Sequence, residues 1–438
     1  MALGGVFATD TDGNLGVDVA TSAEQVSGLI FDISQQSDFW STGAAANLAD
    51  SLQDKVVEFN TLADATELGI TAYTGDEDTD FLSGIPYYHI RHFFKINGGE
   101  GYLYVLFADC SENWDAVVKL QRFAHGQISQ IGIWTEQQLW SSGDDTYTLN
   151  LVSDLQAEAD EMADTYQSPA VILLNANTSK VGDDDVELSK IPSCITGNRS
   201  VCVLLGQSHE DEVREMQASL DSTTPVGNIG AALGLLSNTN VAWCLGYVNY
   251  NDISDYIPSI EFGFGDHELT TTTNDDGESV SYITDGTEYE SLTRAEVDAL
   301  DDLGYVFLCN YVGLTGSVFF SGSQTCDDGD YRTVARNRVI NKSRRLVRAA
   351  LLPYVHASFK IDPSEGTLSD SAITILKNAV NDALETMEEN DEITSIVSVD
   401  IDETQNVLLT DEVIIDYKLC PLGEAKIITV TEGLSLEE

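Results

Sequence analysis

The histidines that lie close enough together in this sequence to share a metal ion are His89 and His92, in the stretch YYHIRHFF. Two histidines three positions apart lie on one face of a helix and could bind one metal there. The aromatic residues around them favour a β-strand, in which the two side chains point to opposite faces of the sheet. We therefore expect a structural role for both histidines and no metal site.

Two other stretches have a composition that could bind ions or phosphate. Residues 10–14 (DTDGN) are weakly similar to a calcium loop, but the glycine comes too early and no glutamate closes the loop. Gly227, Gly230 and Gly234 do not have the GxGxxG spacing, and no Lys-Ser or Lys-Thr pair follows them, so close packing of a helix is the better interpretation. Since no hydrolase, metalloprotease or dithiol motif occurs, we expect no enzyme and no cofactor.

The charge of the chain is strongly unbalanced. It has 73 acidic and 21 basic residues, a net charge of −52. Such a surface repels phosphate and so argues against nucleic-acid binding. It also makes close packing of many copies costly unless salt screens the charges. Adaptation to high salt and a densely packed, water-facing shell are both consistent with this composition.

One segment, residues 331–361, reverses the balance, because it contains no acidic residue. Its basic residues are Arg332, Arg336, Arg338, Lys342, Arg344, Arg345, Arg348 and Lys360. A basic segment in so acidic a chain calls for an acidic partner, either another copy of the chain or a second protein.

Helical periodicity over Arg338–Leu351 separates apolar from basic residues. The apolar side contains Val339, Ile340, Leu346, Val347, Ala350 and Leu351, and the other side contains Arg338, Lys342, Arg344, Arg345 and Arg348. Arg336 falls on the apolar side, so either the helix begins after it or it makes a buried pair. The basic side faces a partner, or its residues form ordinary salt bridges within the chain.

The rest of the C-terminal part predicts a small helix-and-sheet module. Ser369 is a plausible N-cap for an amphipathic helix that continues to about Glu389. Alternating apolar residues then predict strands at Ile393–Ile401 and Val413–Leu419. A last strand at Ala425–Thr431 either closes this module or pairs with a different subunit.

The larger N-terminal part predicts an α/β fold, since buried strands alternate with helices. The expected strands are Val26–Ile33, Gly101–Asp109, Ile128–Thr135, Pro169–Asn175, Val201–Leu205 and Val241–Val248, with two more between Tyr305 and Phe320. The expected helices are Asn47–Glu58, Trp114–Phe123, about Leu149–Tyr166, Asp211–Leu220, Gly230–Leu236 and a short one after Thr293. We predict an extended arm at 1–25, an outer α/β part at 26–326 with an exposed polar loop at about 262–290, and a module at 327–438.

The compartment can be inferred from the cysteines and the N-terminus. The seven cysteines are far apart, and several lie in apolar runs, which is typical of reduced core residues made in a cytoplasm. The sequence has no apolar run long enough to span a membrane, and its first residues do not resemble a secretory signal.

Several stretches resemble contractile tail-sheath proteins, the family of phage tails, phage-tail-like bacteriocins and extracellular contractile injection systems. The resemblance is strongest at 330–350 (DYRTVARNRVINKSRRLVRAA) and continues to the end LCPLGEAKIITVTEG. GGVFATDTDGNLG resembles the N-terminal arm of the phage Mu-like branch, and VGNIGAALGLLSNTNVAWCLGYV resembles part of its middle domain. About 40% of the chain is covered at recognisable strength, by weak motifs in the right order.

The resemblance implies a structural subunit that forms stacked hexameric rings around a tail tube and contracts to drive the tube through a target envelope. The implied partners are other copies of the chain, the tube protein, and baseplate and terminator proteins, with no direct contact to nucleic acid and no membrane insertion. Assembly is expected in the bacterial cytoplasm, and the product is a virion tail or injection particle. No cofactor is implied.

The resemblance also assigns roles to residues. The terminal segments would add strands to the sheets of neighbouring subunits, through Gly5, Val6, Phe7, Ile427, Ile428, Thr429 and Val430. The C-terminal module would lie nearest the tube, so the basic side of its first helix would face the tube or a neighbour. An acidic secreted or surface adhesin or carbohydrate-active protein is the alternative, against which the missing signal peptide and unpaired cysteines argue.

Overall fold

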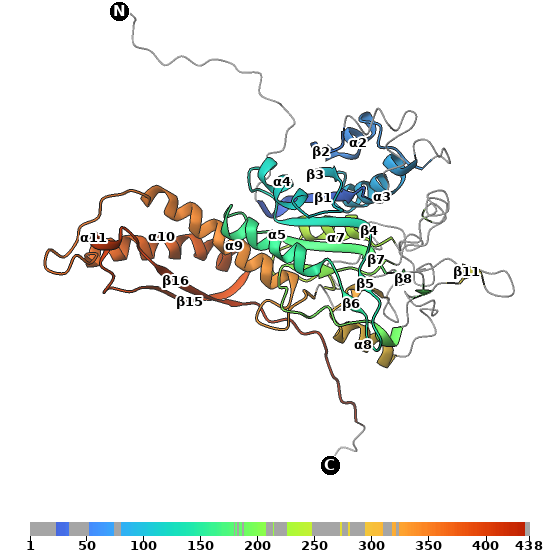
Figure 1. Cartoon of the computed structure of the whole chain (residues 1–438). Helices are drawn as coiled ribbons and strands as arrows, with labels where there is room; N and C mark the ends of the chain where they lie inside the picture. Colours follow the sequence, from blue (N-terminus) through green and yellow to red (C-terminus); the bar gives the residue numbers. More distant parts are fainter. Residues whose placement is uncertain are drawn as a thin grey trace, which may run out of the picture.

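A computed structural model describes residues 23–34, 52–73, 80–178, 180–181, 184–185, 188–206, 213, 226–247, 272–273, 279–280, 294–309, 318–320 and 324–433. A six-stranded sheet forms the centre of the body (Figure 1). In sheet order its strands are β10 (Val201–Val203), β7 (Val171–Asn177), β4 (Gln130–Gln138), β1 (Val26–Asp32), β3 (Glu100–Ala108) and β2 (Val56–Thr61). All neighbours pair in parallel except β2, which runs antiparallel to β3 at the edge.

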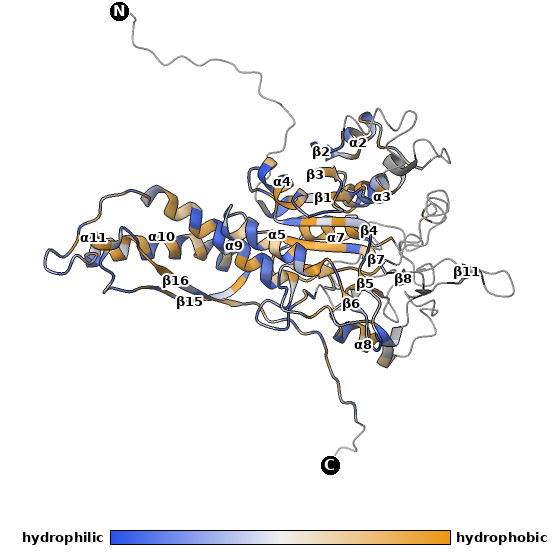
Figure 2. Cartoon of the chain, viewed as in Figure 1, coloured by the Kyte–Doolittle hydropathy of each residue, from blue (hydrophilic) through white to orange (hydrophobic). Residues whose placement is uncertain are grey.

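Helices cover both faces of this sheet. One face packs against α4 (Ala116–Phe123) and α5 (Val152–Asp164), and the other against α3 (Asp80–Ile96) and α7 (Ile229–Asn238). Every residue of β1 and β7 is buried, and β7 begins with the apolar run 171–174, as expected for a strand with helices on both faces. In Figure 2 much of the central sheet is drawn in the colour of apolar residues. The predicted α/β class is confirmed.

The glycines of α7 allow it to lie against α3. A Cβ atom on Gly230 would be 2.0 Å from the carbonyl oxygen of His89, and one on Gly234 would be 3.0 Å from that of Phe93. Close helix packing, which the sequence predicted for these glycines, is confirmed. Both glycines lie inside α7, whereas Gly227 precedes the helix and donates its backbone N–H to Asn175 Oδ1 at 2.9 Å.

The prediction of a strand at His89 and His92 was wrong, since both lie on α3. Tertiary packing overrides the strand preference of the aromatic residues, which here fill the space between the sheet and α7. Burial lowers the pKa of His89 to about 3, so its ring is neutral. Among the described residues, no three metal-binding side chains gather around a possible ion site.

Smaller elements complete the body. They are η1 (Ala23–Gln25), α2 (Leu62–Glu67), η3 (Leu188–Lys190) and α8 (Arg294–Asp302). Four antiparallel pairs join β5 (Trp140–Ser141) to β6 (Thr148–Leu149), β8 (Lys180–Val181) to β9 (Asp184–Asp185), β11 (Thr272–Thr273) to β12 (Ser279–Val280), and β13 (Phe307–Cys309) to β14 (Val318–Phe320). No disulfide joins the cysteines whose side chains are described, and four of these cysteines are buried: Cys110, Cys194, Cys202 and Cys326.

Two predicted elements of the body differ from the structure. The helix expected at Asn47–Glu58 ends in what is β2, whose Val56, Val57 and Phe59 suit an edge strand. The strand expected at Val241–Val248 is a series of turns over its described part, 241–247. The helix expected at Asp211–Leu220 lies outside the described residues, apart from position 213.

The C-terminal module projects from the body as a separate arm (Figure 1). Its main elements are α9 (Val334–Leu351), α10 (Asp370–Glu389), β15 (Ile393–Ile401) and β16 (Ile415–Pro421), with η6 (Leu352–Tyr354) and α11 (Val407–Thr410) between them. Val339 and Val347 of α9 pack with Val380, Leu384 and Met387 of α10. Ser369 is the N-cap residue of α10, as the sequence predicted.

α9 begins four residues before the predicted Arg338. Thr333 caps it by accepting a hydrogen bond from the backbone N–H of Arg336 at 3.2 Å. Arg336 is therefore inside the helix, where it is half-buried and donates to the carbonyl of Asp330 at 3.3 Å. This backbone contact replaces both explanations that the sequence left open for Arg336.

Candidate assembly interface

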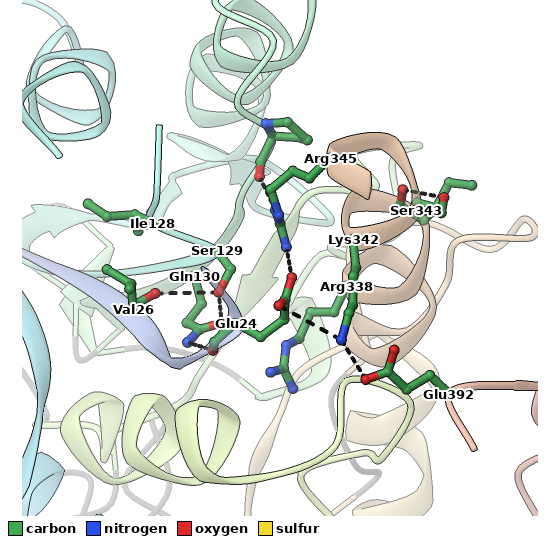
Figure 3. Close-up of polar contacts among 12 residues, drawn as sticks. Glu24, Val26, Ile128, Ser129, Gln130, Arg338, Lys342, Ser343, Arg345 and Glu392 are labelled. Carbon is green, nitrogen blue, oxygen red and sulfur yellow. Dashed lines mark hydrogen bonds and ion pairs between the residues drawn. The ribbon is translucent and has the colours of Figure 1, made fainter. Parts of the chain in front are cut away.

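The basic helix α9 is attached to the body by a cluster of buried charges (Figure 3). Glu24 of η1, which is 7% exposed, lies two residues before the start of β1 and points at α9. Arg345 donates hydrogen bonds to the Glu24 carboxylate and, at 3.1 Å, to the carbonyl of Pro169. One arginine thus joins α9 both to the start of β1 and to the segment that leads into β7.

Lys342 connects the same cluster to the C-terminal hairpin. Its Nζ lies 2.6 Å from Glu392 Oε1 and 3.9 Å from Glu24 Oε2. Glu392 is buried between the end of α10 and the start of β15. The ammonium group therefore lies between two buried carboxylates, one from the body and one from the module (Figure 3).

Arg338 is buried more deeply than the other two. It is 1% exposed and donates to the carbonyl of Leu236, in the last turn of α7. The carbonyls of a last helical turn lack intrahelical partners and carry partial negative charge, so a guanidinium is favourable there. Burial lowers the pKa of Arg338 to about 10, and nearby Glu24 opposes that shift.

The two carboxylates respond differently to this environment. Burial alone would raise the pKa of Glu24, but Arg345 and Lys342 outweigh it and bring the pKa below its ordinary value. Burial raises the pKa of Glu392 in spite of Lys342, and its Oε2 atom has no hydrogen-bond partner. Glu24 is thus the better-compensated anion, and breaking its pairs would leave a buried charge alone.

These contacts change which basic residues of α9 can face a partner. Arg338 must be removed from it because its side chain is inside the chain, and Lys342 and Arg345 are engaged with the chain's own carboxylates. The alternative of intrachain pairing describes these three residues better. Arg348 is exposed and Arg344 half-buried, and neither has an ion-pair partner among the described residues.

The hairpin of the module is a second surface that the chain leaves incomplete. β15 and β16 form a two-stranded sheet, so among the described residues neither outer edge pairs with a third strand. α10 packs on the hairpin, while Val397 is 60% exposed. Unpaired strand edges readily bind an additional strand.

The segment after β16 leaves the body in Figure 1 and forms no strand as far as it is described. A third strand at Ala425–Thr431 that closes this module within the chain is therefore excluded. Lys426 is tied to Asp301 of α8, but Ile427, Ile428 and Val430 beyond it are 79%, 80% and 74% exposed. Pairing of this segment with a different subunit stays a prediction. Gly5, Val6 and Phe7 lie outside the described residues.

Sequence reasoning missed the two residues that hold the cluster together, Glu24 and Glu392. Each is one of 73 acidic residues, and neither lies in a motif. An acidic residue two positions before a fully buried strand, as Glu24 is before β1, was the available signal.

Comparison with known proteins places the fold among contractile-sheath structures. A chain of the anti-feeding prophage (AFP) baseplate matches with a TM-score of 0.53 at 15% identity, covering 100% of both chains. The AFP helical sheath in the contracted state matches with a TM-score of 0.51 at 14% identity, over 99% of each chain. The PVC sheath complex of an extracellular contractile injection system, also contracted, gives 0.51 at 12% identity, over 98% of each chain.

At sequence level, residues 330–438 match the family model "DUF2586, C-terminal domain". No curated protein matches the chain. In the part of the chain that the structure describes, no helix is both long and apolar enough to cross a bilayer. The chain therefore has the fold of contractile-sheath proteins over its full length, and the resemblance to the Mu-like branch stays a prediction.

Proposed function

We propose that this protein is a non-enzymatic structural subunit of a contractile sheath, which assembles as stacked six-membered rings around a tail tube. The observation that carries the proposal is the unfinished module: a two-stranded hairpin with two open edges, followed by an exposed apolar segment at 427–430. In a monomer the open edges and the exposed segment add no stability, whereas in a polymer each hairpin can pair with a segment of a neighbouring subunit. The shared fold with contracted sheaths over the whole chain supports it.

In this proposal the hairpin receives the N-terminal arm and the C-terminal segment of adjacent copies, through Gly5, Val6, Phe7 and Ile427–Val430. These links persist while the bodies change neighbours, so the sheath shortens without falling apart. The module lies toward the tube, and Arg344 and Arg348 remain available to the tube or to an adjacent copy. Assembly takes place in the bacterial cytoplasm on a baseplate, and the product is a tail or injection particle.

Electron microscopy of the purified chain tests the proposal. The full chain should form hollow, ribbed tubes or stacked rings, alone or with its tube protein. Deletion of residues 427–438, or of residues 1–13, should leave a folded monomer and no tubes. Tubes of normal length from both deletion variants would refute strand exchange, and the absence of any ordered assembly from the full chain would refute the sheath role.

The alternative of an adhesin or carbohydrate-active protein predicts a stable monomer that binds a glycan. No feature of the described residues favours it over the sheath, and a glycan array with the full chain would reveal such binding.

A further inference from the structure

A hollow of about 420 Å³ lies where the end of α9 meets two turns of the body. The last turn of α4 contributes Arg122, the turn after α4 contributes His125, and the turn after α5 contributes Tyr166. α9 contributes Arg345 and Arg348. No carboxylate lines this basic hollow, although the chain has more than three acidic residues for each basic one.

Two of its cations are not neutralised within the chain. Arg348 is exposed and makes no ion pair with any described residue. The Arg122 guanidinium lies 5.0 Å from the centre of the Tyr166 ring, a contact that orients the cation without cancelling its charge. Arg345 is paired with Glu24 and so contributes less. The exposed Leu352 adds an apolar wall beside these groups.

The neighbouring surface is of mixed charge. A larger hollow of about 890 Å³ shares Arg122 and Tyr166 with the basic one, and its other charged residues are Asp54, Asp115, Glu158, Glu161, Lys55 and Lys119. Burial raises the pKa of Glu158, and Asp115 adds to the shift. A long polyanion such as nucleic acid would meet these carboxylates as soon as it extended beyond the basic hollow. A protein segment with a few carboxylates and an apolar side chain fits better.

We propose that the basic hollow binds an acidic segment of a second copy of this chain. The inference rests on the proposed function, in which many copies are in contact. It identifies the basic hollow as one site of contact between two copies. Two copies that each carry a net charge of −52 repel one another, so a stable contact must set carboxylates of one against cations of the other. In a partly enclosed hollow such pairs are screened less than on an open surface.

Charge reversal tests this contact. Arg348→Glu should weaken self-association of the full chain at least about tenfold at low salt, measured by sedimentation velocity. Arg122→Glu should act in the same direction. Lys360→Glu is the control, because Lys360 is exposed and lies outside the hollow but changes the net charge equally. Unfolding temperatures should stay near that of the unmodified chain for all three, since these side chains are exposed.

A photo-crosslinker identifies the occupant. Benzoylphenylalanine in place of Leu352 should crosslink to an acidic segment of another copy, which mass spectrometry of the joined peptides would locate. Crosslinks to the tube protein alone, or to nucleic acid, would overturn the proposal. So would a full chain that does not self-associate, or an Arg348→Glu variant that associates like the Lys360→Glu control.

The two proposals fail in different ways. If ribbed tubes form normally from the Arg348→Glu variant, the basic hollow is not a contact and the sheath role stands. If copies crosslink at Leu352 but only small oligomers are ever seen in micrographs, the contact stands and the sheath role fails.

Discussion

The body and the C-terminal module differ in how completely a single chain buries their strands. In the body, β1 and β7 are buried at every position and have helices on both faces. In the module, β15 is fully buried only at its two ends, and no residue of β16 is. A single chain therefore buries these strands of the body. In the described part of the module, the hairpin edges stay unpaired and several apolar side chains stay exposed.

In the proposed assembly, this contrast indicates which part of the chain can still gain free energy when subunits associate. Removing apolar surface from water stabilises by about 25 cal/mol per Å². The body has already gained this stabilisation on folding. Val397, Ile427, Ile428 and Val430 stay exposed, so in the proposed assembly a second chain that covered them would add further stabilisation. In that proposal, subunits linked through their modules exchange contacts between bodies that stay rigid.

The largest expected effect comes from filling the contact between α3 and α7. Gly230→Leu would place a Cβ 2.0 Å from a backbone carbonyl, so we expect a loss in the free energy of unfolding beyond the usual range of about 1–3 kcal/mol for overpacking. Urea unfolding followed by tryptophan fluorescence measures it. Gly423→Leu is the matched control, since a Cβ there meets no atom within 4 Å. Equal stability of the two variants would contradict the close packing.

The next effect tests the junction between body and module. Arg345→Met removes the hydrogen-bonded ion pair of the buried Glu24 carboxylate and leaves it the longer pair with Lys342, at 3.9 Å, so we expect a loss of about 3 kcal/mol in the free energy of unfolding. Lys119→Met is the control, because its 3.1 Å pair with Asp54 is 45% and 62% exposed and should contribute less than about 1 kcal/mol. Similar losses from both variants would show that the buried cluster has no special role.

A smaller effect depends on pH. The pKa of Glu24 lies below its ordinary value of 4.5 in the folded chain, so the stability it contributes is complete above that value and disappears as the pH falls through the lowered pKa. The stability difference between the unmodified chain and Glu24→Gln should therefore be larger at about pH 6 than at about pH 3. Urea titrations at both values measure it. A difference that does not change with pH would contradict the assigned ion pairs.

The smallest effect on stability should come from the segment that we propose links neighbouring subunits. Deleting residues 427–438 removes the exposed Ile427, Ile428 and Val430, so the unfolding temperature should change by less than about 2 °C. Ile393→Ala, at a buried position of the same module, should cost about 2–4 kcal/mol in comparison. A large loss of stability from the deletion would mean that the segment packs on its own chain.

Much of the secondary structure was predictable from local patterns. The strands β1, β3, β4 and β7 were all predicted, and β7 followed from a continuous apolar run, which indicates a strand buried on both faces. The α10 helix and its N-cap followed from apolar periodicity and Ser369. His89 and His92 were misassigned because aromatic residues prefer strands, and only the packing of α3 against α7 decides otherwise.

The sequence by itself determined that residues 331–361 are basic and that α9 is two-sided, because composition and periodicity are local properties. Only the tertiary structure decided which of its cations face inward. A helical wheel shows direction around an axis, but it does not show that α7 ends beside Arg338 or that Glu24 lies beside Arg345. Burial and pairing depend on residues that are distant in the chain, and in this protein they leave Arg348 and the hollow around it available to a partner.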